Sequence, residues 1–79
     1  MSVYIGRYVK FKNDLYKVAK IYKTDGDYLI YDYLAFDQKY REFISNDGRC
    51  KLEDVEFITK DEFTKIVMSW VTVLLEHYY

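Results

Sequence analysis

The chain of 79 residues contains no proline, one cysteine, one histidine and three glycines. A single cysteine excludes a disulfide framework and a cysteine-ligated structural zinc site, and it fits a reducing compartment. The glycines, at positions 6, 26 and 48, are too scattered to form a phosphate-binding loop. A chain this short lies near the lower limit for burying a self-sufficient core. Without disulfides or a metal, a partner subunit is the remaining source of extra stability.

The scarcity of chemically active side chains predicts a protein that is not an enzyme and that has no metal or cofactor. His77 lies close to the chain end, where fraying prevents the fixed position that a general base needs. Cys50 lies between Arg49 and Lys51, which could lower the pKa of its thiol and make it reactive. No base or resolving thiol accompanies Cys50, so we expect it to be an ordinary strand residue, with a reactive thiol as the alternative.

The first residues lack a basic segment followed by an apolar core, so we expect no signal peptide. The longest apolar stretch, residues 66–75, is too short to span a bilayer. We therefore expect a cytoplasmic protein with no membrane partner. The abundance of Lys, Ile, Tyr and Phe resembles the composition of small accessory proteins of AT-rich lytic bacteriophages or of AT-rich bacteria. That resemblance implies an inhibitor or modulator of a host or defence protein that acts by steric occlusion.

Charge is unevenly spread along the chain, although the net charge is only −1. Residues 1–23 carry six basic side chains and one acidic side chain, whereas residues 24–79 carry six basic and twelve acidic ones. Such a distribution favours steering toward a charged partner, or contact between unlike patches of two copies. Simple solvation of a small surface is the alternative.

Residues that favour tight turns separate several segments rich in β-branched and aromatic side chains. We predict turns at Asn13-Asp14, Asp25-Gly26 and Asn46-Asp47-Gly48. Strands are predicted in residues 7–12, 15–23, 28–34 and 39–45, with one more within residues 50–58. The fold class is therefore α+β, a four- or five-stranded twisted antiparallel sheet or small open barrel followed by one C-terminal amphipathic helix. Residues 1–79 form a single domain, with the β-unit in residues 1–58 and the helix in residues 59–79.

The first hairpin can be placed in register if Asn13-Asp14 is a two-residue turn. Phe11 then faces Tyr16, and Val9 faces Val18, on one buried face. A bulge at Ala19-Lys20 would return Ile21 to that face. The side chains predicted to be buried are Val9, Phe11, Val18 and Ile21, and those predicted to be exposed are Lys10, Lys12 and Lys17.

From Thr59 the apolar period changes to that of a helix. Thr59 and Glu62 have the spacing of a capping box. At 100° per residue, one broad apolar stripe contains Phe63, Ile66, Val67, Trp70, Val71, Val73, Leu74 and Tyr78. Met68 and Leu75 lie beyond its edge, so the apolar arc is wider than one sheet face needs. A C-terminal strand at residues 70–74 is the alternative, because β-branched residues are dense there.

The pattern of residues 6–11, 15–18, 28–33 and 52–57 resembles a Src-homology-type or Tudor-type small barrel. The resemblance implies a recognition module for peptides, modified side chains or nucleic acid. The acidic loop and tryptophan pair of the peptide-binding versions cannot be located, and the only tryptophan, Trp70, lies in the predicted helix. That departure disfavours binding of proline-rich peptides.

Surplus tyrosine and surplus apolar helix surface predict a protein–protein interface, because tyrosine gives large contact area with few rotamers to freeze. The predicted partner-binding residues are Tyr28, Tyr31, Tyr33, Tyr40, Met68, Val71, Leu75 and Tyr78. Met68, Val71 and Leu75 could also pair two helices across a two-fold axis to form a homodimer. The alternative function is nucleic-acid binding through Tyr8, Lys10, Lys12 and Lys17 of the first hairpin. A further alternative is that all these apolar residues close a tight monomer core.

Overall fold

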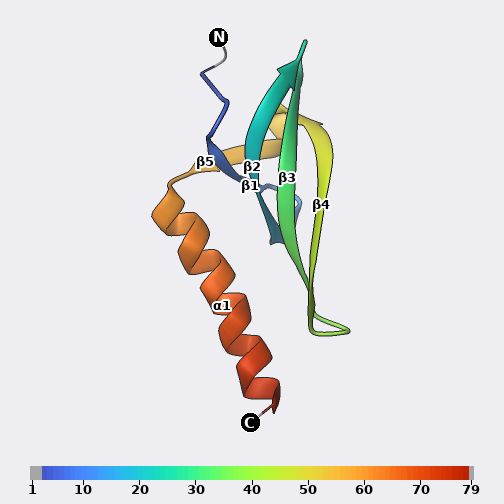
Figure 1. Cartoon of the computed structure of the whole chain (residues 1–79), viewed down its shortest axis with the longest axis vertical. Helices are drawn as coiled ribbons and strands as arrows, with labels where there is room; N and C mark the ends of the chain where they lie inside the picture. Colours follow the sequence, from blue (N-terminus) through green and yellow to red (C-terminus); the bar gives the residue numbers. More distant parts are fainter. Residues whose placement is uncertain (1–2, 79) are drawn as a thin grey trace.

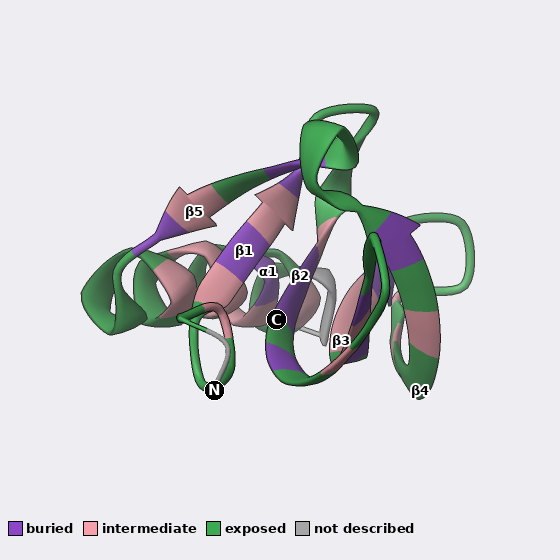
Figure 2. Cartoon of the chain, turned by 90° about the horizontal axis from the view of Figure 1, so that it is seen from above, coloured by how far each residue is buried: buried purple, intermediate pink, exposed green. Residues whose placement is uncertain are grey.

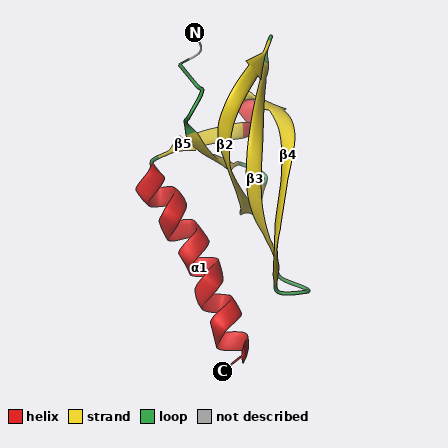
Figure 3. Cartoon of the chain, in the orientation of Figure 1, coloured by secondary structure: helices red, strands yellow, loops and turns green. Residues whose placement is uncertain are grey.

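The computed structural model describes residues 3–78, with side chains described as far as Glu76. Figures 1 and 3 show an antiparallel sheet followed by one long helix. The elements are β1 (Tyr8–Phe11), β2 (Asp14–Asp25), β3 (Tyr28–Asp37), β4 (Glu42–Lys51), the 3₁₀ helix η1 (Leu52–Asp54), β5 (Val55–Ile58) and α1 (Lys60–Tyr78). The predicted α+β fold is confirmed, and the alternative of a C-terminal strand is wrong. Within the described residues, no helix has the length and apolar character needed to cross a membrane.

The five strands are arranged in the order β4-β3-β2-β1-β5. Strands β2, β3 and β4 form a meander along the long axis of the molecule, and β5 crosses it at a steep angle (Figure 1). Because β5 pairs with β1 and β4 pairs only with β3, the sheet stays open between these two edge strands. The shape is elongated, with extents of 47 × 22 × 18 Å.

The first two turns lie within one residue of their predicted positions. The β1–β2 turn is Lys12-Asn13 instead of Asn13-Asp14. The predicted pairings of Phe11 with Tyr16 and of Val9 with Val18 are wrong, because Phe11 pairs with Asp14 and a register shift after Lys10 places Val9 opposite Ala19. The β2–β3 turn is at residues 26–27, where Gly26 has a φ of +59°. A backbone of that kind is left-handed and favours glycine.

The third predicted turn is wrong, because Asn46, Asp47 and Gly48 lie inside β4. The chain turns instead at residues 38–41. The Asp37 carboxylate accepts hydrogen bonds from the Lys39 amide at 2.9 Å and from the Tyr40 amide at 3.1 Å. Local bonds of this kind compete with strand pairing, and they end β3 at Asp37.

The sheet is buried on both faces, which explains why neighbouring residues such as Val18 and Ala19 are both buried. Side chains that follow one another along a strand point to opposite faces. On one face lies the inner cluster, formed by Val9, Phe11, Ala19, Ile21, Leu29, Tyr31, Cys50 and Val55. On the other lies the helix-side cluster, formed by Val18, Phe36, Ile58 and Trp70. Figure 2 shows buried positions along β1 and β2, with α1 beside them.

Burial of Val9, Phe11, Val18 and Ile21 is confirmed. The prediction that they share one face is wrong, because Val18 belongs to the helix-side cluster and the other three to the inner cluster. The bulge predicted at Ala19-Lys20 is also wrong. The strand registers shift instead between Lys10 and Phe11 and between Ile21 and Lys23.

The helix begins at the predicted capping box. The Glu62 amide donates to Thr59 Oγ1 at 3.1 Å, and the Thr59 amide donates to Glu62 Oε1 at 3.3 Å. Five apolar residues of α1 pack toward the sheet, and Trp70 is the most buried of them at 4% exposure. These residues are Phe63, Ile66, Val67, Trp70 and Leu74. The helix α1 begins next to β5, and its C-terminal end extends below the level of the β3–β4 turn (Figure 1).

Candidate partner-binding surfaces

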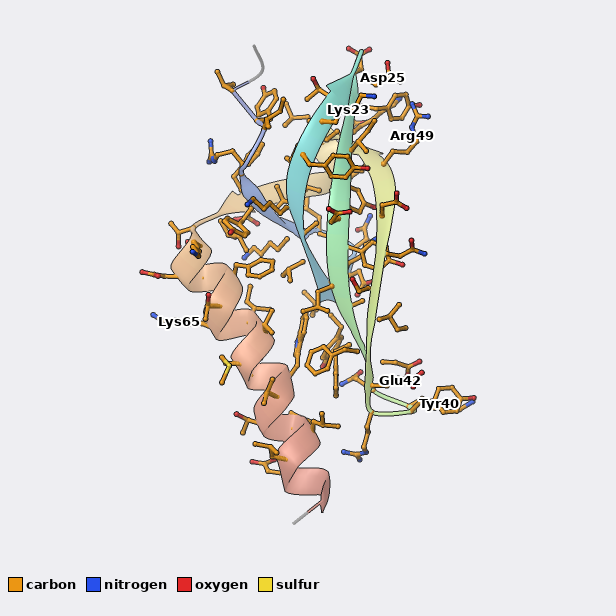
Figure 4. The ribbon with its side chains drawn as sticks, in the orientation of Figure 1. Lys23, Asp25, Tyr40, Glu42, Arg49 and Lys65 are labelled. Atoms are coloured by element: carbon orange, nitrogen blue, oxygen red, sulfur yellow. The ribbon has the colours of Figure 1, made fainter. Side chains whose placement is uncertain are left out.

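The outward side of α1 is an apolar surface without charge over three turns. Residues 66–75 contain no charged side chain. Within them Met68 is 54% exposed, Leu75 is 50% exposed and Val73 is 42% exposed. Lys65, the last charged residue before this stretch, points away from the sheet (Figure 4). We call this stretch the uncharged helix surface.

Its two hydroxyl groups are already bonded within the helix. Ser69 Oγ donates to the Ile66 carbonyl at 2.6 Å, and Thr72 Oγ1 donates to the Met68 carbonyl at 3.1 Å. Back-bonded hydroxyls of this kind have less capacity to bind outside groups. The uncharged helix surface can therefore offer a partner mainly van der Waals contact and apolar burial.

The three helix residues predicted to form a homodimer differ in their exposure to solvent. Met68 and Leu75 face outward, as the helical projection predicts, whereas Val71 is half-buried. The Tyr78 side chain, also predicted to bind a partner, lies outside the described side chains, as does that of His77.

The predicted tyrosines do not form a common surface. Tyr31 is buried in the inner cluster, and Tyr33 packs beside it with ring centroids 6.1 Å apart. Tyr28 is on the opposite face and is 37% exposed, while Tyr40 projects from the β3–β4 turn and is 67% exposed (Figure 4). Alternation along β3 separates Tyr28 from Tyr31 and Tyr33. Of the predicted tyrosines whose side chains the structure describes, Tyr28 and Tyr40 are the exposed ones.

Lys17 is held among aromatic rings on the face of the inner cluster. Its ammonium nitrogen lies 4.4 Å from the ring centres of Phe11 and Tyr33 and 5.1 Å from that of Tyr31. It also donates to the Tyr31 hydroxyl at 3.1 Å. A cation over aromatic faces is attracted by their electron density. The predicted full exposure of Lys17 is wrong, and its charge serves the fold.

The basic face predicted on the first hairpin is not assembled. Tyr8 packs on Phe63 with ring centroids 4.8 Å apart, and Lys10 pairs with Glu56 at 3.9 Å. Lys12 is exposed in the turn after β1, while Lys17 belongs to the opposite face. The four residues predicted for nucleic-acid binding therefore do not share one surface.

A different group of cations lies at the upper end of the sheet, on the helix-side face that α1 leaves open. Cross-strand pairing aligns Lys23, Ile30 and Arg49 in one row, and Asp25, Tyr28 and Lys51 in the next. Arg49 lies over the Tyr28 ring at 4.2 Å and pairs with Asp25 at 3.9 Å. Figure 4 shows Lys23, Asp25 and Arg49 together at this end. The pairing of β2, β3 and β4 brings these residues together, so their proximity could not be predicted from the linear sequence.

An open cavity of about 660 Å³ lies at the same end of the molecule. Leu29, Leu52 and Tyr4 supply its apolar lining, and residues of both charges surround them. The remaining lining residues are Thr24, Gly26, Asp27, Lys51 and Glu53. Among the described residues, no group of three or more His, Cys, Asp or Glu side chains could hold a metal ion.

Cys50 is a buried member of the inner cluster. Burial raises the pKa of its thiol, the Asp54 carboxylate raises it further, and the Lys17 ammonium acts in the opposite direction. The prediction of an ordinary strand residue is confirmed, because Cys50 lies buried in β4, and the alternative that Arg49 and Lys51 lower its pKa is wrong. Strand alternation directs those two side chains to the other face.

We expect Cys50 to react with Ellman's reagent about tenfold or more slowly in the native protein than in urea, because the thiolate is scarce and the sulfur is covered. Since the pKa is raised, the native rate should still increase with pH where that of an unperturbed thiol has levelled off. The measurement is the absorbance of the released thionitrobenzoate from pH 7 to about 10.5, so that the range extends beyond the ordinary pKa of a thiol. Equal rates in native and unfolded protein would contradict the buried, protonated thiol.

Comparison of the chain with protein-family models, with curated proteins and with solved structures finds no match. The surfaces described above are therefore the basis for assigning a function.

Proposed function

We propose that the protein is a docking module that binds another protein through the uncharged helix surface of α1. One observation carries the proposal: residues 66–75 lack charge, yet Met68 and Leu75 stay half exposed while Trp70 on the opposite side of the helix is buried. A helix that packs on one sheet face needs an apolar stripe on that side only. Met68 and Leu75 belong to neither hydrophobic cluster of the described residues.

The dimensions of the molecule support the proposal. A compact folded chain of 9.6 kDa exposes about 5,100 Å², whereas this chain exposes 5740 Å². Its radius of gyration is 13.3 Å, against about 11.6 Å for a compact domain of this length. The excess surface, about 600 Å², is comparable to one side of a standard protein interface at about 800 Å².

The chemistry of this surface defines the partner. With no charge and with back-bonded hydroxyls, the surface fits an apolar groove or helix face and does not fit a charged strand or a phosphate backbone. Binding of this kind depends weakly on salt, because screening acts on charges and not on apolar burial. A module that contributes contact area alone acts on its partner by occluding a surface.

The fold also fits a recognition module. The open five-stranded unit, with β5 returning beside β1, fits the resemblance to small recognition barrels.

The test compares a double variant, Met68→Glu/Leu75→Glu, with the wild type in affinity capture from a lysate of the producing cells. The control is Asn13→Glu/Gln38→Glu, which makes the same change in net charge at exposed turn positions. We expect wild type and control to retain the same protein at high salt and the double variant to lose it. Affinity for the purified partner should fall by about thirtyfold or more, the effect of removing an interface hot spot.

The double variant should keep the native circular dichroism spectrum, because both side chains are half exposed. Retention of the partner by the folded double variant would overturn the proposal. Failure of the wild type to retain any protein would also count against it.

Nucleic-acid binding is a second candidate, favoured by the row of Lys23 and Arg49 beside Tyr28. Lysine and arginine neutralise phosphates, and a tyrosine ring can stack on a base. This candidate predicts affinity for single-stranded oligonucleotides that falls steeply with salt and is lost in Lys23→Glu/Arg49→Glu. The helix variant should leave that binding unchanged, so one pair of variants separates the two functions.

A further inference from the structure

The strand β4 is a long edge of the sheet. All ten of its residues, Glu42–Lys51, pair with β3 on one side, and no described strand pairs with it on the other. The opposite edge, β5, has four residues. An edge strand presents unpaired main-chain amides and carbonyls and is a template for another strand. The β4 edge is therefore the larger template of the two.

One hydrogen bond shows which main-chain groups of β4 face outward. The Asp47 amide donates to Asn46 Oδ1 at 2.8 Å, so this amide is directed toward the free side and not toward β3. In an antiparallel sheet the direction of the main-chain groups alternates along the strand. Ser45, Asp47, Arg49 and Lys51 consequently direct their amides and carbonyls toward an incoming strand. Local side chains occupy two of these amides, because the Lys51 amide also donates to Asp54 Oδ2 at 2.9 Å, and both side chains must turn aside when a strand is added.

The side chains of Asp47 and Arg49 also share a face, because the two residues are separated by one position. Arg49 lies over Tyr28 on the helix-side face. Its ion pair with Asp25, at 3.9 Å, joins side chains that are 58% and 68% exposed. Exposed pairs of this kind contribute little to stability. The Arg49 guanidinium is thus free to take a second carboxylate.

A second copy of the chain can add to this edge with complementary charges. A two-fold axis perpendicular to the sheet places residues of the same face opposite one another. With the axis at Gly48, Asp47 of each copy lies opposite Arg49 of the other. With the axis at Asp47 or at Arg49, that residue lies opposite its own copy, and like charges directly opposite are destabilising. Of these three registers, charge favours the one centred on Gly48, which alone among them forms two opposite-charge pairs.

Two further features fit that register. Gly48 has no side chain, so the strands can approach closely on the axis. The same register brings Ile44, 41% exposed, toward Leu52 of the second copy, which is 44% exposed. The paired stretch runs over residues 45–51, and both copies keep the uncharged helix surface free.

We propose that two copies of this chain form a dimer by antiparallel pairing of their β4 edges, centred on Gly48, with Asp47 of each copy paired with Arg49 of the other. This inference goes beyond the docking function, because it concerns another surface and needs no other protein. The charge pair occurs twice in the dimer, so each substitution acts twice.

The experiment measures molar mass against concentration by sedimentation equilibrium for wild type, Asp47→Arg, Arg49→Asp and the double swap Asp47→Arg/Arg49→Asp. Each single reversal places like charges in opposition and should raise the dimer dissociation constant at least about tenfold. The double swap restores both pairs and should recover dimerisation to within about threefold of the wild type. Met68→Glu/Leu75→Glu should leave the dimer intact.

A wild-type protein that stays monomeric up to millimolar concentration would overturn the inference. So would a dimer that survives both single reversals but is lost in the helix variant, since that result assigns dimerisation to α1. Circular dichroism of each variant checks that the fold is retained. A single reversal at Asp47 or Arg49 should abolish the dimer and leave capture of the partner protein unchanged. That result would show that dimerisation and docking use different surfaces.

Discussion

Replacing Trp70 with alanine should lower the free energy of unfolding by about 3–5 kcal/mol, the range for removal of a large buried aromatic side chain. Its ring centroid lies 6.3 Å from those of Tyr16 and Phe36 and 6.4 Å from that of Phe43. Trp70 thus joins α1 to three strands of the sheet. A chain of 79 residues has a total stability of about 4–12 kcal/mol, so this loss should leave α1 largely detached from the sheet.

The measurement is urea unfolding followed by far-ultraviolet circular dichroism, because the variant lacks the only tryptophan of the chain. Met68→Ala is the matched control on the opposite side of the helix and should cost less than about 0.5 kcal/mol. Trp70→Phe keeps most of the ring contact and should fall between the two. Equal losses for Trp70→Ala and Met68→Ala would contradict the anchoring role of Trp70.

Replacing Gly48 with alanine should destabilise the protein by about 1–3 kcal/mol, the usual cost of overpacking a core. A Cβ atom at this position would lie 2.8 Å from the Tyr31 hydroxyl oxygen and 3.0 Å from Cζ. Tyr31 cannot easily move away, since it is buried, its ring packs on Phe11 and its hydroxyl accepts a hydrogen bond from Lys17. Without this contact, alanine would be favoured over glycine in a strand by about 0.5–1 kcal/mol.

A double-mutant cycle with Tyr31→Leu tests the cause of that loss, because leucine removes the atoms nearest to the new methyl group. The two substitutions together should cost less than the sum of the single ones. Thermal unfolding of the four proteins gives the coupling energy. Additive losses would contradict the steric cause, because Gly48 lies in strand β4 without a left-handed backbone and has no other requirement for glycine.

The helix was predictable because its signals are local. The capping residues Thr59 and Glu62 lie three positions apart, and the 3.6-residue period needs no knowledge of the rest of the fold. The same projection placed Met68 and Leu75 on the outer side, which the structure confirms. Local patterns of this kind established α1, its start and the exposed part of the candidate docking surface.

The sheet was less predictable because its details depend on contacts between distant segments. The segment Asn46-Asp47-Gly48 has the composition of a turn, yet Gly48 is needed inside β4 for the close approach of Tyr31. Burial of both Val18 and Ala19 requires a helix on the second face, which a single hairpin does not show. The packing of Lys17 among three rings likewise depends on side chains from three strands.

The return of β5 to β1 has a consequence for the order of folding during synthesis. Tyr8 pairs with Ile58 and Phe11 with Val55, so these partners are 44 to 50 positions apart in the chain. The β2–β3 and β3–β4 hairpins instead close over short turns, which costs far less loop entropy. On the ribosome, the meander can form as soon as β4 emerges, while β1 keeps one edge unsatisfied until residues 55–58 leave the exit tunnel. The nascent chain is therefore most prone to misassociation in the interval when β4 has emerged from the tunnel and β5 has not.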